Sequence, residues 1–364
     1  LIQNGATSFD NNYNSIGGGF YLSGSSPTIA NLIIAGNSGG MDASGITLTS
    51  ASPLLKNITI TNNYTFETNA GALYCIDDAN PVLQNCIIWG NHGGDIQVNN
   101  NSTLSATYSN IRGNWVGDGN IDANPLFCNM NIENYTLAEN SPCVGSGVGG
   151  VNMGANDIGC GPIYAGPTWY VATTGSDQSG DGSDNNPFST IQRGIDYCNS
   201  GDTVNVSSGT YSENINWPES NGINLIGSDD SECIINGNQN GSVILINSDR
   251  VDSNTVIKGF RIQNGDNYYG GGINLINASP TLENLTITNN HGTRGGGLSA
   301  NSNIKMVDIN ITNNSSNSRG GGVHFNYSNA SLVNVTVDNN SSVYGGGIYL
   351  NNSHINLENS GIVN

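Results

Sequence analysis

The sequence is poor in charged residues, and the few that it has are mostly acidic. Of 364 residues, 9 are Lys or Arg and 28 are Asp or Glu, which gives a formal net charge of −19. So few basic side chains cannot line a track for a phosphate backbone, and nucleic acid is therefore excluded as an expected partner. The chain also lacks an apolar run long enough to cross a bilayer, so we expect no membrane span in it.

Glycine, by contrast, is abundant, with 50 residues, and four Gly-Gly-Gly triplets begin at Gly270, Gly295, Gly320 and Gly345. The triplets lie 25 residues apart, and each opens a short alternating run such as Ile273-Asn274-Leu275. Such runs have the two-residue period of strands with one buried face, and no helical pattern fits between them. The fixed repeat predicts an all-β solenoid, a parallel β-helix in which successive coils stack along one axis.

Asparagines recur at two corner positions of the predicted coils. Like residues of stacked strands lie about 4.8 Å apart, so we expect their side chains to bond along the stack as ladders. The first file comprises Asn31, Asn57 and Asn85, and later Asn284, Asp308, Asn334 and Asn359. The second file comprises Asn37, Asn63 and Asn91, and later Asn290, Asn314 and Asn340.

The repeat is interrupted in the middle of the chain, which predicts two tandem modules. Residues 1–163 are expected to be the C-terminal part of a first β-helix module, with a closing segment at 128–163. Residues 164–168 form a linker, and residues 169–364 hold the N-terminal cap and the coils of a second, truncated module. Pro187 and the apolar spacing after it predict one short capping helix near 188–198. We expect the chain to be a piece of a longer array.

Seven cysteines occur at spacings that match no zinc pattern. Cys128 and Cys143 flank a compact irregular segment and are our disulfide candidate, while Cys198 with Cys233 is a second candidate. The odd total leaves at least one free thiol or a partner outside the chain. This cysteine usage favours oxidising export, and hence an extracellular or cell-surface location.

These features resemble the secreted, right-handed parallel β-helix repeat proteins of the pectin-lyase-like superfamily. The segments 170–177, 186–192 and 201–204 resemble the N-terminal capping region of that group. Asn124-Pro125-Leu126-Phe127, Ser141-Pro142-Cys143 and Asp157-Ile158-Gly159 resemble a C-terminal segment that is found in cell-surface-anchored bacterial members. The resemblance implies a fold rather than a function, because this architecture serves lyases, hydrolases, adhesins and passive stalks alike.

Enzymes of this fold, as the resemblance implies, group carboxylates with a basic residue on one sheet face. The regular coils after residue 270 carry only four acids, which fall in different columns: Glu283, Asp308, Asp338 and Glu358. No catalytic residue is therefore predicted, and whether the protein is an enzyme stays open, with the sequence leaning against it. We expect a non-catalytic structural or adhesive protein that forms a rigid surface rod, layer or filament. The alternative is a polysaccharide lyase or glycoside hydrolase.

One loop could hold a metal ion, although no cofactor is required. Asp177, Ser179 and Asp181 place oxygen ligands at the first, third and fifth positions of a segment with Gly182 sixth, as in the start of a calcium loop. Asp184 could add a ligand. The twelfth position is Phe188, where a calcium loop has a bidentate Glu, so a plain solvated loop remains the alternative.

An exposed column is predicted to contact a glycan or a partner. The residues before the four triplets are Tyr269, Arg294, Arg319 and Tyr344, which we name the Arg–Tyr file. Cation–π contacts could offset the repulsion between its arginines, and the file could hold a carboxylate- or sulfate-bearing glycan. Four solvated turn residues are the alternative. The neighbouring strand positions, expected to form a flat polar face, are Asn274, Ser299, His324 and Tyr349. Candidate partners are copies of the protein, neighbouring modules and surface polysaccharide.

Overall fold

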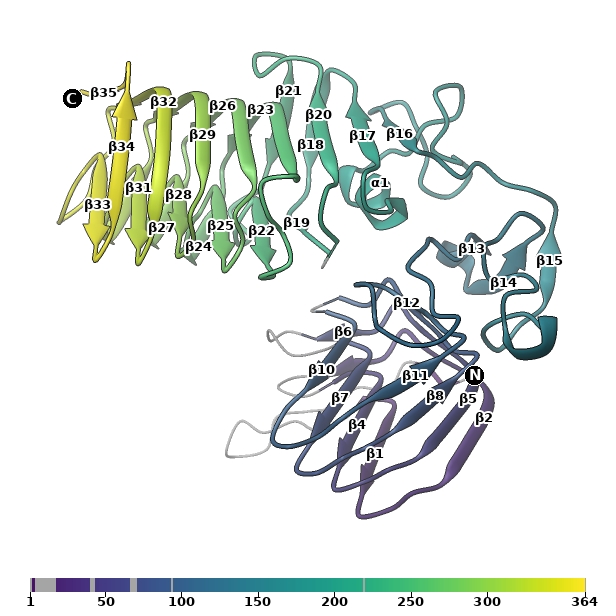
Figure 1. Ribbon diagram of the computed structural model, residues 1–364. Coiled ribbons are helices and arrows are strands. Elements are labelled where there is room, and N and C mark those ends of the chain that lie inside the picture. The colour runs from purple at the N-terminus through teal and green to yellow at the C-terminus, as the bar shows by residue number, and fades with distance from the viewer. Residues whose placement is uncertain are drawn as a thin grey trace. The chain divides into compact units, whose positions relative to one another are not determined.

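The computed structural model describes residues 2–3, 18–39, 43–65, 71–92, 94–218 and 220–363. The chain divides into two compact units, unit 1 (Leu1–Ala165) and unit 2 (Gly166–Asn364), and the division falls inside the expected linker. Within each unit, short strands from successive coils lie side by side (Figure 1). The fold is thus an all-β parallel solenoid, as the 25-residue repeat predicts.

In unit 1, three parallel sheets form the faces of the coils. The first contains β1 (Phe20–Ser23), β4 (Ile46–Thr49), β7 (Leu73–Ile76) and β10 (Ile96–Val98). The second contains β2 (Thr28–Ala35), β5 (Leu54–Thr61), β8 (Val82–Gln84), β9 (Ile87–Trp89), β11 (Ser105–Thr107) and β12 (Asn110–Ile111). The third contains β3 (Ser38–Gly39) and β6 (Tyr64–Thr65).

The closing segment of unit 1 departs from the repeat. It forms a small sheet of β13 (Phe127–Asn129), β14 (Asn134–Ala138) and β15 (Ile158–Cys160), together with the 3-10 turns η1 (Met130–Ile132) and η2 (Val148–Gly150). Strands β13 and β14 pair antiparallel, whereas the strands of the coils pair parallel. The lost periodicity in the sequence therefore marks a real change of architecture.

Unit 2 also has three sheets. The largest contains β16 (Thr168–Val171), β17 (Thr203–Val206), β18 (Gly209–Ser212), β20 (Asn224–Gly227), β21 (Cys233–Asn236), β23 (Val256–Gln263), β26 (Thr281–Thr288), β29 (Lys305–Thr312), β32 (Asn329–Asp338), β34 (His354–Glu358) and β35 (Gly361–Ile362). The second contains β19 (Ile215–Asn216), β22 (Ile244–Asn247), β25 (Ile273–Ile276), β28 (Leu298–Ala300), β31 (Val323–Asn326) and β33 (Ile348–Asn351). The third contains β24 (Asp266–Tyr269), β27 (His291–Arg294) and β30 (Ser315–Arg319).

The glycine triplets of successive coils stack so closely that a larger residue would not fit between them. The first glycine of each triplet has a positive φ, as at Gly295 with +70°, which glycine adopts without strain. The second and third lie against the next coil: a Cβ on Gly296 would sit 2.2 Å from the carbonyl oxygen of Ser315. Backbone hydrogen bonds join triplet to triplet, as from Gly296 N to Gly320 O at 3.1 Å. The triplets therefore form a corner at which the backbones of successive coils are in close contact.

Apolar side chains fill the interior in columns. One column in unit 2 runs through Leu225, Ile257, Leu282, Met306 and Leu332, which are paired in register and fully buried. Each such side chain stabilises the fold by about 1.5–3 kcal/mol relative to an exposed one. Since each coil buries its face against its neighbours, the coils stabilise one another.

The expected capping helix is present but shorter than its sequence pattern. Helix α1 (Ile191–Tyr197) lies beside β16 and β17 (Figure 1). It begins late because Thr190 has an extended backbone and caps it by accepting a hydrogen bond from Arg193 N. Asp177 Oδ1 accepts the Ser189 and Thr190 N–H groups, so these residues stay outside the helix. No helix in the described part of the chain has the length and apolar character of a membrane span.

Candidate functional site

The residues of the Arg–Tyr file are neighbours in space. Tyr269 pairs with Arg294, Arg294 with Arg319, and Arg319 with Tyr344, at the ends of β24, β27 and β30. Adjacent strands lie about 4.8 Å apart, so the two arginines stand one coil from each other. The file is thus a continuous row along the stack, as its 25-residue spacing requires.

Aromatic rings surround both guanidinium groups. Arg294 Nη1 donates a hydrogen bond to Tyr269 Oη at 3.0 Å, and its guanidinium carbon lies 5.5 Å from the centre of the Tyr269 ring and 5.7 Å from that of Tyr268. The guanidinium carbon of Arg319 lies 5.2 Å from the centre of the Tyr349 ring. These cation–π contacts favour both cations at this surface.

Tyr268 also lies against Arg294, although the sequence analysis missed it. We name Tyr268, Tyr269, Arg294, Arg319 and Tyr349 the cationic cluster. The Tyr268 ring packs edge-on against that of Tyr269, with 4.7 Å between centres, and Tyr268 is half exposed. The signal was present, because two tyrosines stand together before Gly270. Alternation along a strand would place neighbours on opposite faces, but the sharp turn at the triplet lets both rings reach Arg294.

The flat polar face expected at Asn274, Ser299, His324 and Tyr349 is wrong for its first three members. Asn274, Ser299 and His324 are buried, with His324 only 3% exposed. The physical reason is the turn at each triplet, which folds back against the strand that it opens: a Cβ on Gly295 would lie 3.1 Å from that of Ser299. Tyr349 remains partly exposed, and its ring stacks on that of His324 with 5.6 Å between centres.

The cluster is cationic in a strongly acidic chain. Among the described residues, the one salt bridge joins Lys258 to Glu283 at 2.5 Å, so neither Arg294 nor Arg319 is paired with a carboxylate there. Arg294 Nε is buried and has no hydrogen-bond partner within that part of the chain. Burial first, and then the two arginines, lower the pKa of His324 from 6.5 to about 4, so this imidazole is neutral at neutral pH.

The residues of the proposed calcium loop serve the cap in the structure. Both carboxylate oxygens of Asp177 accept hydrogen bonds from Ser189 or Thr190, and Asp181 Oδ1 accepts two from Ser183. Within the described residues, no group of three or more His, Cys, Asp or Glu side chains could hold a metal ion. Ser179 and Asp184 join no such group. Calcium binding at this loop stays a prediction.

The two asparagine files differ in their hydrogen bonds and in their burial. In the first, Asn57 Nδ2 donates to Asn31 Oδ1 at 2.9 Å, and Asn85 Nδ2 to Asn57 Oδ1 at 3.2 Å. Asn284, Asp308, Asn334 and Asn359 all have a positive φ, and Asn334 Nδ2 donates to Asp308 Oδ1 at 2.8 Å.

The second file is buried and doubly bonded. The backbone N and Nδ2 of Asn290 both donate to Asn314 Oδ1, and those of Asn314 both donate to Asn340 Oδ1, at 2.9–3.0 Å. The equivalent ladder in unit 1 runs from Asn37 through Asn63 to Asn91, whose side chain donates to Asp95 at 2.7 Å. These amides satisfy backbone groups that the corners leave unpaired.

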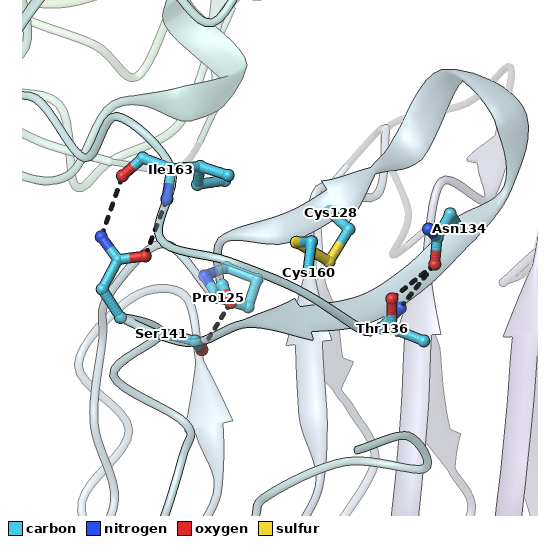
Figure 2. The surroundings of a disulfide bond; sticks show 8 residues. Pro125, Cys128, Asn134, Thr136, Ser141, Cys160 and Ile163 are labelled. Atoms are coloured by element: carbon cyan, nitrogen blue, oxygen red, sulfur yellow. Dashed lines mark hydrogen bonds between the residues drawn. A yellow bond between two sulfur atoms is a disulfide. The ribbon is translucent and has the colours of Figure 1, made fainter. Parts of the chain in front are cut away.

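Both disulfide candidates are wrong. Cys128 bonds to Cys160, so the bridge joins β13 to β15 across a sequence separation of 32 residues (Figure 2). Cys143 is instead a buried thiol that accepts a hydrogen bond from Asn110 Nδ2, and Cys198 and Cys233 are buried cysteines that do not bond to each other. Flanking a compact segment did not identify the pair, because β15 returns beside β14 and brings the Cα atom of Cys160 to 6.0 Å from that of Cys128.

Two pairs of adjacent acids, Asp77-Asp78 and Asp229-Asp230, lie outside the strands. Asp77 and Asp78 both have a positive φ. Asp229 Oδ1 accepts hydrogen bonds from Ser231, and Asp230 Oδ2 accepts one from Thr286 Oγ1 at 2.7 Å. The carboxylates of Asp229 and Asp230 thus accept hydrogen bonds from the chain itself.

A comparison with models of protein families agrees with this architecture. Residues 1–158 match the model of a family described as "Right handed beta helix region", and residues 173–229 match that of "Protein of unknown function (DUF1565)". The class that the fold and the first model define is the right-handed parallel β-helix. Among solved structures, pectin methylesterase from carrot aligns with 11% sequence identity and a TM-score of 0.32, over 56% of this chain and 90% of that chain. A search of curated proteins found no match.

Proposed function

We propose that the protein is a non-catalytic, extracellular structural or adhesive β-helix whose unit 2 contacts an acidic glycan through the Arg–Tyr file. One observation carries this proposal: Arg294 and Arg319 stand one coil apart, framed by aromatic rings, with no carboxylate paired to either among the described residues. A guanidinium presents several donors in a fork that matches a carboxylate or sulfate. The tyrosine rings offer apolar surface beside it.

The location outside the cell is part of the same proposal. The Cys128–Cys160 disulfide supports it, because such bonds persist in oxidising compartments and are rare where thiols are kept reduced. Surface polysaccharide and further copies of the protein are the partners that such a setting offers. Calcium is not needed for the contact at the file.

The test is an array of acidic and neutral oligosaccharides probed with the full chain. We expect binding to carboxylated or sulfated members, and at least tenfold weaker binding for the Arg294→Ala/Arg319→Ala variant. Charge-assisted hydrogen bonds contribute about 1.5–3 kcal/mol each, and 1.4 kcal/mol is a factor of ten in affinity.

A matched control removes two positive charges elsewhere in unit 2. Arg250→Ala/Lys305→Ala changes the net charge equally, and both side chains are exposed. Equal weakening by the two double variants would mean that only overall charge matters, and the file would lose its role. Release of shorter oligosaccharides from any array member would favour a lyase or hydrolase instead.

A further inference from the structure

His324 is a buried histidine beside the cationic cluster, with the Tyr349 ring between it and Arg319. It sits on β31 between Ser299 of β28 and Tyr349 of β33, its partners in register. Its Nδ1 is 3.4 Å from Ser299 Oγ, and its ring stacks on Tyr349, over which Arg319 lies. A buried imidazole therefore stands one ring away from a guanidinium that has no carboxylate partner.

We propose that one anionic group, a carboxylate or sulfate ester, bridges Arg294 and Arg319, and that His324 takes up a proton from solvent when this group binds. The proposal rests on the proposed function and adds the regulation of that site: binding is tighter in mildly acidic surroundings. Because coupling between two ligands is reciprocal, the proton then strengthens binding of the anion as much as the anion strengthens binding of the proton.

The groups that face His324 explain why it responds. The neighbouring strands offer the neutral Ser299 and Tyr349, and the ends of β27 and β30 offer Arg294 and Arg319. Both charges that act on the imidazole are positive, and burial adds to their effect in holding its pKa low. An anion on the arginines cancels their repulsion and adds attraction, so it raises the pKa of His324.

The size of the effect follows from linkage. Each pKa unit by which the anion raises the pKa of His324 tightens binding about tenfold at a pH below both values. The free protein starts from a pKa of about 4. If anion binding raises the pKa of His324 to the ordinary value of a histidine, the affinity for the anion rises about tenfold or more as the pH falls from 8 to 5.

The experiment measures binding and titration on the full chain with two probes, a sulfated tetrasaccharide and a uronic-acid tetrasaccharide. Both keep their charge from pH 5 to pH 8, a range that lies above the sequence pI of about 4.1. Calorimetry at each pH gives the affinity, and proton uptake shows as a dependence of the heat on the buffer. NMR of the imidazole follows the pKa of His324 with and without probe in the unaltered protein.

We expect tighter binding at pH 5 for both probes and a raised pKa of His324 in the complex. The His324→Gln variant should bind with the weak pH dependence that arises from overall charge alone, and near-ultraviolet circular dichroism checks that it folds. An unchanged His324 pKa on saturation would overturn the inference while leaving the proposed function intact. Binding of neither probe at any pH would overturn both.

Discussion

The end of unit 1 and the start of unit 2 are closed by different chemistry, although the coils of the two units use the same device. At the start of unit 2, α1 is held through its backbone: Glu213 accepts the N–H groups of Ile191 and Gln192, at 2.8 and 2.9 Å. At the end of unit 1, a disulfide and an antiparallel pair of strands close the segment (Figure 2). The coils repeat one set of contacts, whereas each end depends on contacts made once.

The comparison teaches where the molecule tolerates change. In a coil, each group is enclosed by the same group of the coil before and after it, so an added atom meets backbone on both sides. At an end, one side is open. Mutations of the same kind should therefore differ sharply in effect between the two settings.

The largest expected effect is that of Gly296→Ala in a coil. The new Cβ would lie 2.2 Å from Ser315 O and 2.6 Å from Gly321 O, both backbone atoms that cannot move without shifting the stack. We expect unit 2 to lose about 4 kcal/mol or more of unfolding free energy, measured by chemical denaturation.

Gly161→Ala is the matched control at the end of unit 1. A Cβ there would meet no heavy atom within 4 Å, and Gly161 has no positive φ, so we expect a change within about 0.5 kcal/mol. Similar losses from the two variants would contradict the contrast between coil and end.

Loss of the disulfide should have the next largest effect. The Cys128→Ser/Cys160→Ser variant should destabilise unit 1 by about 2–4 kcal/mol, because the bond closes a long loop, and leave the unfolding of unit 2 unchanged. Reduction of the unaltered protein should have the same effect, because it breaks the same Cys128–Cys160 bond. Hydrogen exchange measures the stability of each unit separately. Equal destabilisation of both units would show that the ends are not independent.

The smallest effect is a change in pH dependence at the cap. Burial raises the pKa of Glu213, an effect that outweighs the two N–H bonds and to which Asp177 and Asp196 add. A folded-state pKa above the unfolded value gives stability that is present below the unfolded pKa and lost as pH rises through the folded one.

Glu213→Gln should therefore flatten the decline of unit 2 stability above the ordinary pKa of Glu. At neutral pH it should cost about 1 kcal/mol, since Ile191 and Gln192 donate to different oxygens of Glu213 and the side-chain NH2 that replaces one of them cannot accept. The measurement is a series of denaturation curves from pH 5 to pH 8, and an unchanged slope would remove Glu213 from the cap's pH response. Asp202, whose pKa burial also raises, retains part of the slope.

Much of the fold could be predicted because stacking converts sequence spacing into distance. The triplets, the corner asparagines and the Arg–Tyr file became neighbours through this one rule. The partner of Cys128 could not be predicted, because the closing segment has no period. The burial of His324 was missed for another reason: period-two alternation gives the face of a side chain but not the turn that folds over that face.

The buried ladder carries a consequence for how such a chain can change length. From Leu275 to Thr281 is six positions, from Ala300 to Lys305 five, and from Phe325 to Ser331 six, yet these residues stay paired in register. One turn thus absorbs single-residue insertions and deletions while the amide column stays unbroken. Such a chain can therefore gain or lose a residue at that turn, whereas elsewhere it can lengthen by the duplication of whole coils.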